Sequence, residues 1–167
     1  MSIEQSAATK TSFGSPIAEL SPRDRKTAIT GYELRHQIEA LVAGIAAKKI
    51  RHVYSGTGAW TSPDVMCLPT LPQLLMFRQN EVHILLGYGA HEICHQLESD
   101  FEIIKTIFAD IENPTKEEIR LKHWWNAIED YRIEKITKTD YPGFARWINA
   151  LREHSTQRFL DDVQAGR

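Results

Sequence analysis

The feature that most constrains this chain is the pentapeptide His-Glu-Ile-Cys-His at residues 91–95, which lies inside an apolar segment. Residues four apart on an α-helix share one face and stand about one turn apart. If the segment is helical, His91 and His95 therefore present two imidazoles to one point. Apolar residues on both sides (84–86, 93 and 97) place this helix against a core, where unpaired imidazoles are costly to bury.

Two histidines at this spacing are typical of a divalent-metal site, and zinc is the metal that such a pair most often binds. Glu92 follows the first histidine and can point toward the open side of the ion. In that position a carboxylate acts as the general base that takes a proton from the attacking water. The pattern predicts one Zn²⁺ bound by His91 and His95, with Glu92 as the catalytic residue.

A third ligand has to come from another element, and the acidic segment at residues 126–134 is the candidate. Asp130 and Glu134 share a helix face, with Asn126 one turn earlier. We predict Asp130 as the ligand because it alone has an acidic partner four residues on. Glu129 is the alternative, turned by about 100° on the helix. Glu134 and Asn126 are expected to hydrogen-bond the ligands. The competing interpretation is a solvated charged face.

Three side chains could close the site with a fourth ligand: Cys94, Asp100 and the spare acid of the 129–130 pair, which is turned by about 100° from its neighbour. Cys94 projects away from the direction that the two histidines share, so we expect a small buried side chain rather than a ligand. Asp100 falls on the opposite side of the helix if that helix runs unbroken from residue 80 to 107. The sequence therefore predicts an open site with three protein ligands, as in catalytic rather than structural zinc centres.

Periodicity and turn residues predict the fold. Apolar residues with helical spacing indicate helices at about 28–49, 80–107 and 115–139, and a last one after Tyr-Pro-Gly at 141–143. Thr115 and Glu118 form a capping-box pattern at the start of the third. Apolar runs at 50–54 and 65–68 predict short strands. Residues 1–26 lack periodicity and are expected to form a flexible arm able to bind a protein partner. Residues 27–167 then form one α+β, mostly helical domain.

Composition excludes several classes of partner. The net charge of −2 over 167 residues argues against a nucleic-acid binder with a broad basic surface. No apolar run approaches the roughly 18 residues needed to span a membrane. Two cysteines are too few for a disulfide framework and favour a cytoplasmic setting.

Three stretches of the sequence together resemble the N-terminal region of bacterial and phage proteins of the cobaltochelatase CobT-like family. They are residues 91–101, the run Asn-Ala-Ile-Glu-Asp-Tyr-Arg-Ile-Glu at 126–134, and Tyr-Pro-Gly at 141–143. The resemblance spans roughly residues 65–150. It implies a zincin-like metallopeptidase fold, with His91, His95 and an acid of the 129–130 pair as zinc ligands and Glu92 as base.

Members of that family add an acidic linker and a von Willebrand A-type domain, which this sequence does not contain. A compact version of this family suggests a protein of a phage or mobile element, and we expect a phage-encoded form to act in the host cytoplasm. We therefore expect a zinc-dependent peptidase acting on a peptide or protein substrate. The alternatives are a non-enzymatic interaction module on a zincin scaffold and a CobT-like accessory subunit of a metal-chelatase-type complex.

Overall fold

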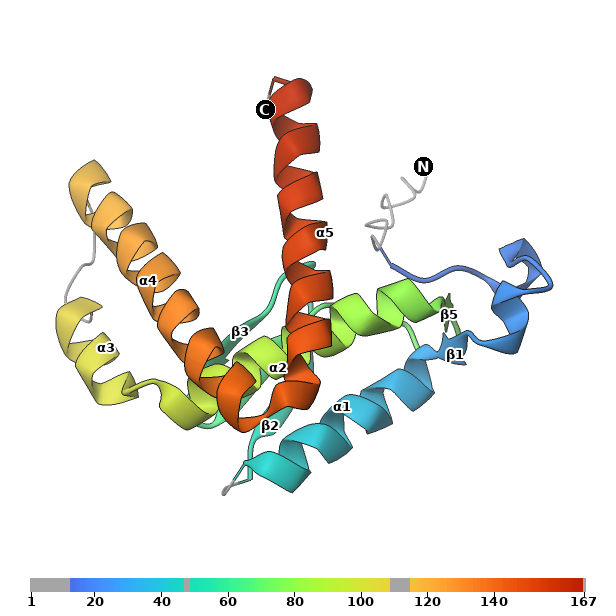
Figure 1. The fold of residues 1–167 in the computed structure, drawn as a ribbon, viewed down its shortest axis with the longest axis horizontal. Coiled ribbons are helices and arrows are strands. Elements are labelled where there is room, and N and C mark those ends of the chain that lie inside the picture. Colours follow the sequence, from blue (N-terminus) through green and yellow to red (C-terminus); the bar gives the residue numbers. More distant parts are fainter. Residues whose placement is uncertain (1–12, 47–48, 109–114, 167) are drawn as a thin grey trace, which may run out of the picture.

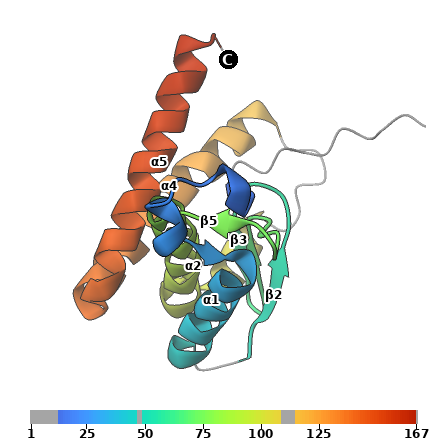
Figure 2. The ribbon, with the colours of Figure 1, turned by 90° about the vertical axis from the view of Figure 1, so that its right-hand side faces the viewer.

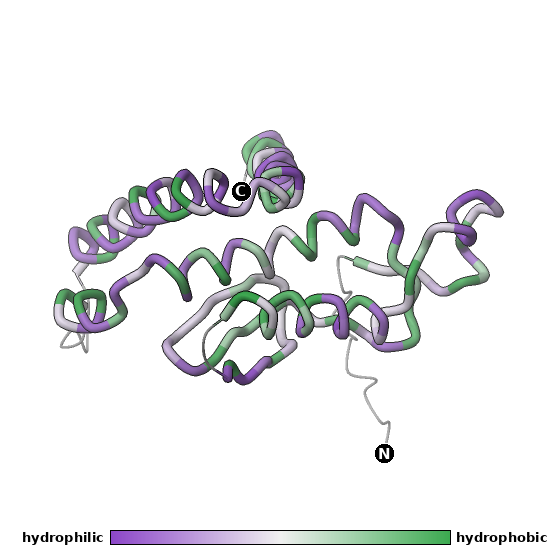
Figure 3. The backbone as a smooth tube through the Cα atoms, turned by 60° about the horizontal axis from the view of Figure 1, so that its bottom comes forward, coloured by the Kyte–Doolittle hydropathy of each residue, from purple (hydrophilic) through white to green (hydrophobic). Residues whose placement is uncertain are grey.

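A computed structural model of the chain describes residues 13–46, 49–108 and 115–166. These residues form an α+β fold that is mostly helical, as the sequence predicts. Its α-helices are α1 (Gly31–Ile45), α2 (Gln79–Glu98), α3 (Phe101–Phe108), α4 (Lys116–Asp140) and α5 (Ala145–Gln164). The central helix is α2, with α1 and the strands on one side and α4 and α5 on the other (Figures 1 and 3).

Two helices begin at capping boxes that fix their first turns. At α4 the Thr115 hydroxyl accepts from the Glu118 amide at 3.2 Å, and the Glu118 carboxylate accepts from the Thr115 amide at 2.7 Å. This confirms the predicted start of the helix at residue 115. The same reciprocal pair joins Thr30 and Glu33, so α1 starts at Gly31, three residues later than the apolar period indicates.

The strands form two small sheets. One has the order β2 (Arg51–Tyr54), β4 (Val65–Leu68), β3 (Trp60–Ser62), with β2 and β4 parallel and β3 antiparallel to β4. The other pairs β1 (Ile29–Thr30) with β5 (Met76–Phe77). The predicted strands at 50–54 and 65–68 are confirmed as β2 and β4. The edge strand β3 was not predicted, and it matters because it lies against α2, where the Gln96 amide donates to the Ser62 carbonyl at 2.6 Å.

The prediction of one unbroken helix over residues 80–107 is wrong. The helix α2 ends at Glu98, Ser99 is extended (φ −91°, ψ 137°), and α3 starts at Phe101. The cause is a new cap. Asp100 Oδ1 accepts from the amides of Glu102 and Ile103 at 3.0 and 3.1 Å, which satisfies the first turn of α3. A short polar side chain therefore breaks this helix without a glycine.

The described part of the predicted flexible arm, residues 13–26, is packed on the domain (Figure 2). It contains the 3₁₀ turns η1 (Ile17–Glu19) and η2 (Asp24–Lys26). Phe13 and Leu20 are buried, and the backbone of Ser15 exchanges two hydrogen bonds of 2.9 Å with Met76. The burial of these two apolar side chains stabilises the packing of residues 13–26 on the domain, although the segment has no helical or strand periodicity. Residues 1–12 of the arm lie outside the described residues.

The core forms where α2 meets its neighbours. It is built from fully buried apolar side chains of α1, α2, α4 and α5 and of strands β4 and β5, among them Leu34, Ile38, Met66, Phe77, Leu85, Ile93, Ile133 and Ile148. The turn η3 (Pro142–Phe144), at the predicted break, folds α5 back against α2. Within the described ranges, no helix combines the length and the apolar character needed to cross a membrane.

Gly87 sets how closely α2 and α5 approach. A Cβ at this position would lie 2.8 Å from Leu151 Cβ and closer still to the Trp147 carbonyl oxygen, which is backbone and cannot swing away. We expect Gly87→Ala to lower the free energy of unfolding by about 1–3 kcal/mol through overpacking. Gly44→Ala on α1, where nothing lies within 4 Å, is the control and should be neutral or stabilising. Urea denaturation of both variants tests this, and a neutral Gly87→Ala would contradict it.

Candidate metal centre

The crossing of α2 and α4 brings three potential ligand atoms together. His91 Nε2 lies 3.7 Å and His95 Nε2 lies 3.2 Å from Asp130 Oδ1. One ligand atom from each of these residues falls within 4.8 Å of the others, the spacing of atoms that bind one ion. Among the described residues, this is the one group of histidine, cysteine and acidic side chains so arranged.

The first imidazole is oriented by a buried carboxylate. His91 Nδ1 lies 3.0 Å from Glu134 Oε1, and a carboxylate can only accept, so Nδ1 carries the proton and Nε2 presents its lone pair. Arg152 and Lys138 hold the other oxygen of Glu134. Burial opposes charge on His91, but the bond to Glu134 and the surrounding carboxylates outweigh it and raise the pKa of His91 above its usual value.

The second imidazole is oriented by a hydrogen-bonded chain. The Ser99 hydroxyl donates to Glu129 Oε1 at 2.7 Å and lies 3.0 Å from His95 Nδ1. A hydroxyl has a single proton, so Ser99 has to accept from His95 Nδ1, which again leaves Nε2 unprotonated. Glu129 is fixed in turn by Arg132, whose Nε and Nη2 donate to its two oxygens at 2.8 Å. These bonds from Arg132 are the main reason that the pKa of Glu129 is lowered.

The third atom completes a set of acceptors. Asn126 Nδ2 donates to Asp130 Oδ2 at 3.1 Å, which leaves Oδ1 turned toward the histidines. That oxygen is buried and accepts no hydrogen bond from the described residues. Two imidazole lone pairs and a carboxylate oxygen thus face one another, an arrangement that repels itself unless a proton or a cation lies between them. Two nitrogens and one carboxylate oxygen are also a donor set that zinc accepts.

The structure separates the two acids that the sequence left as alternatives. Asp130 points to both histidines, whereas Glu129 is bound by Ser99 and Arg132. Glu134 and Asn126 lie where hydrogen bonds to the ligands were expected. Ser99 and Arg132 were not anticipated. Their sequence signals are the i+4 spacing of Ser99 from His95 and the i+3 spacing of Arg132 from Glu129.

The other two candidates for a fourth ligand, Cys94 and Asp100, also lie elsewhere. Cys94 is completely buried beside Thr137 in the core, and burial raises the pKa of its thiol to about 11, which opposes the thiolate that binds metal. Asp100 is exposed and caps α3. Its absence from the site therefore follows from the helix break and not from the opposite side of a continuous helix.

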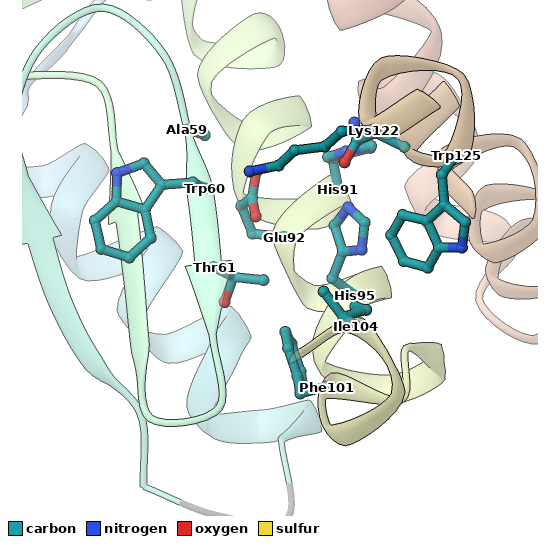
Figure 4. A pocket seen from close by; sticks show the side chains of 11 residues that line it. Ala59, Trp60, Thr61, His91, Glu92, His95, Phe101, Ile104, Lys122 and Trp125 are labelled. Atoms are coloured by element: carbon teal, nitrogen blue, oxygen red, sulfur yellow. The ribbon is translucent and has the colours of Figure 1, made fainter. Parts of the chain in front are cut away.

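Glu92 lies beside the histidines and is 4% exposed. Burial raises the pKa of its carboxyl to about 7, against the lowering effect of His91 and His95. A carboxyl that titrates near neutral pH can both accept and return a proton, which a general base in hydrolysis has to do. Figure 4 shows Glu92 with His91 and His95 in one cavity.

That cavity has a volume of about 230 Å³. The helix α2 supplies its polar side through His91, Glu92 and His95. The other walls come from the segment of β3, from α3 and from α4 (Figure 4), with the lining residues Ala59, Trp60, Thr61, Phe101, Ile104, Lys122, Trp125 and Asn126. A buried carboxyl and two imidazoles are thus reachable from a mostly apolar opening.

Comparisons of the chain with protein-family models, with curated proteins and with solved structures found no significant match. The resemblance to CobT-like proteins and to the zincin fold therefore stays a prediction. The functional interpretation below is built on the geometry of the centre and on the cavity beside it.

The buried Glu92 gives the metal-free protein a defined pH dependence. Its carboxyl titrates near 4.5 when exposed and at about 7 in the fold. Between these values the folded state keeps a proton that the unfolded state has lost, so the free energy of unfolding falls as pH rises. At pH values above about 7 the folded protein bears the full free-energy cost of burying the ionised carboxylate, on the order of 3 kcal/mol. We expect Glu92→Gln to remove it.

The measurement is urea denaturation of both proteins in a chelating buffer. Glu92→Gln should raise the free energy of unfolding at about pH 8 and change it little at about pH 4.5, because the wild-type carboxyl is then protonated in the fold. An equal effect at the two pH values would show that Glu92 does not titrate as its burial requires.

Proposed function

We propose that this protein is a zinc-dependent peptidase with a zincin-like site. The observation that carries the proposal is the convergence of His91 Nε2, His95 Nε2 and Asp130 Oδ1, each with its other polar atom engaged elsewhere. Oriented imidazoles with hydrogen-bonded Nδ1 atoms are the usual form of histidine ligands. Glu92 lies next to them in an accessible cavity, which supports a catalytic rather than a structural role.

His91, His95 and Asp130 would hold the zinc ion. Zinc supplies Lewis acidity to such a site, polarising a carbonyl and making water acidic enough to attack at neutral pH. Glu92 accepts the proton of the attacking water and returns it to the leaving amine. Glu134 and the Ser99–Glu129 pair keep the two imidazoles in the required tautomer.

The strand β3 supports a polypeptide as the substrate. It is an edge strand with β4 on one side, and the segment Ala59–Thr61 lines the cavity opposite Glu92. An extended peptide can pair with the free side of an edge strand, which would hold its backbone beside the base. Hydrolysis of a peptide bond thus agrees with both the chemistry of the centre and the shape of its surroundings.

Metal content is the first test. Protein purified without chelator should contain close to one zinc per chain, and His91→Ala, His95→Ala and Asp130→Asn should lose it because each removes a ligand. Glu129→Gln should keep zinc with reduced affinity, since it disturbs only the chain that orients His95. His123→Ala, an exposed histidine of α4 outside the centre, is the control. Full zinc in His95→Ala, measured by elemental analysis, would refute the assignment.

Peptide hydrolysis is the second test. Glu92→Gln should lower kcat by about 10²–10⁴-fold, because the general base is lost, and should retain its zinc. Cleavage of casein and of a broad peptide library, each with and without chelator, gives the readout. Wild-type activity that survives the substitution would remove Glu92 from the mechanism.

A second function draws on a different surface. On α4 the exposed residues Leu121, Trp124, Ile128 and Tyr131 form a stripe with alternating spacings of three and four residues. Such a stripe is typical of a helix that packs against another helix. A zinc-loaded wild type that leaves the whole peptide library uncleaved would favour this interaction module over the peptidase.

A further inference from the structure

The candidate centre is open on two sides. Besides the cavity of about 230 Å³, a second one of about 500 Å³ reaches the same residues from the side of α5. Ala59, His91, Glu92 and Asn126 line both cavities, so the two meet at the catalytic base. A chain lying across Glu92 can therefore continue in both directions.

The two sides differ in chemistry. The second cavity is lined on its outer side by polar groups of α5, namely Arg152, Ser155 and Thr156, with Tyr88 of α2. Arg152 is already bound to Glu134, so its charge serves the centre. A site for chain ends needs a closing wall close to the scissile bond, whereas the two cavities meet at Glu92. The basic side chain that lines the first cavity, Lys122, extends toward Glu92 itself (Figure 4). A cleft that continues on both sides favours an internal bond.

The first cavity has an apolar wall. Phe101 and Ile104 of α3 and Trp125 of α4 stand around the side of His95 (Figure 4). The volume of about 230 Å³ is below the range of about 300–1,000 Å³ that is usual for whole small-molecule ligands. A cavity of this size suits one large side chain better than a whole ligand. Aromatic and branched walls of this kind bind an apolar group.

Resting on the proposed peptidase function, we infer that the protein cleaves internal peptide bonds and selects a bulky apolar side chain next to the scissile bond. The backbone crosses Glu92 between the two cavities, and the side chain enters the cavity formed by Phe101, Ile104 and Trp125. In the balanced reaction, water adds to the carbonyl carbon, the C–N bond breaks, and the proton from water goes through Glu92 to the amine. Trp125 is then a specificity-determining residue.

The experiment compares zinc-loaded wild type, Trp125→Ala and Phe159→Ala on peptides acetylated at the N-terminus and amidated at the C-terminus. One position is varied among Phe, Leu, Ala and Asp. The wild type should cut these blocked peptides beside Phe or Leu, always on the same side. Trp125→Ala should raise KM for them by about tenfold or more and keep its zinc. Phe159, an aromatic residue of α5, is 66% exposed and does not line either cavity, so its removal should leave KM for these peptides unchanged.

A binding measurement separates this inference from the function on which it rests. Labelled blocked peptide should bind to zinc-loaded Glu92→Gln, detected by fluorescence anisotropy, and adding Trp125→Ala should weaken binding by a similar factor. Cleavage restricted to peptides with a free terminus, or internal cleavage without apolar preference, would overturn the inference and leave the peptidase intact. Binding without any cleavage would support the cleft and refute the peptidase. Absence of both would refute both.

Discussion

Each histidine of the centre has its Nδ1 atom committed to a neighbour, and the rest of the site depends on this constraint. Glu134 accepts a hydrogen bond from Nδ1–H of His91 and Ser99 accepts one from Nδ1–H of His95, so both Nε2 lone pairs are directed at Asp130. The two Nε2 atoms and Asp130 Oδ1 form a cluster of acceptors, and such a cluster is stabilised by a positive charge between them. In the metal-free chain, the hydrogen bond to Glu134 and the nearby carboxylates Glu92 and Asp130 outweigh burial and raise the pKa of His91.

The break between α2 and α3 links the fold to the site. Ser99 leaves the helix, and its hydroxyl bridges His95 on α2 and Glu129 on α4. Arg132 of α4 adds a second connection between the two helices. It binds Glu129 and also donates to the Glu98 carbonyl at the end of α2 at 2.6 Å. In a continuous helix, α3 would extend along the axis of α2 and would not form the apolar wall of the cavity.

Local patterns predicted much of this arrangement. The i, i+4 spacing placed His91 and His95 on one face, and the capping box at Thr115 located the start of α4. Which of Asp130 and Glu129 faces the histidines depends on how α4 is rotated about its axis. That rotation is set by tertiary packing, in which Ile133 of α4 is buried in the core, and a local pattern does not record it. The helix break was missed since Asp100 can lie within a helix or cap one, and periodicity does not distinguish these. The packing of residues 13–26 rests on long-range contacts with β5 and α2, which no local pattern records.

The most direct test of the account is the coordination shell of the zinc-loaded protein, measured by X-ray absorption. Two imidazole nitrogens at about 2.0–2.1 Å and oxygens from Asp130 and solvent at about 2.0–2.2 Å are predicted, because His91, His95 and Asp130 alone converge among the described residues. The shell should lose one imidazole in His95→Ala and stay unchanged in His123→Ala. A sulfur at about 2.3 Å would identify a cysteine ligand and a closed structural site, and would contradict the account.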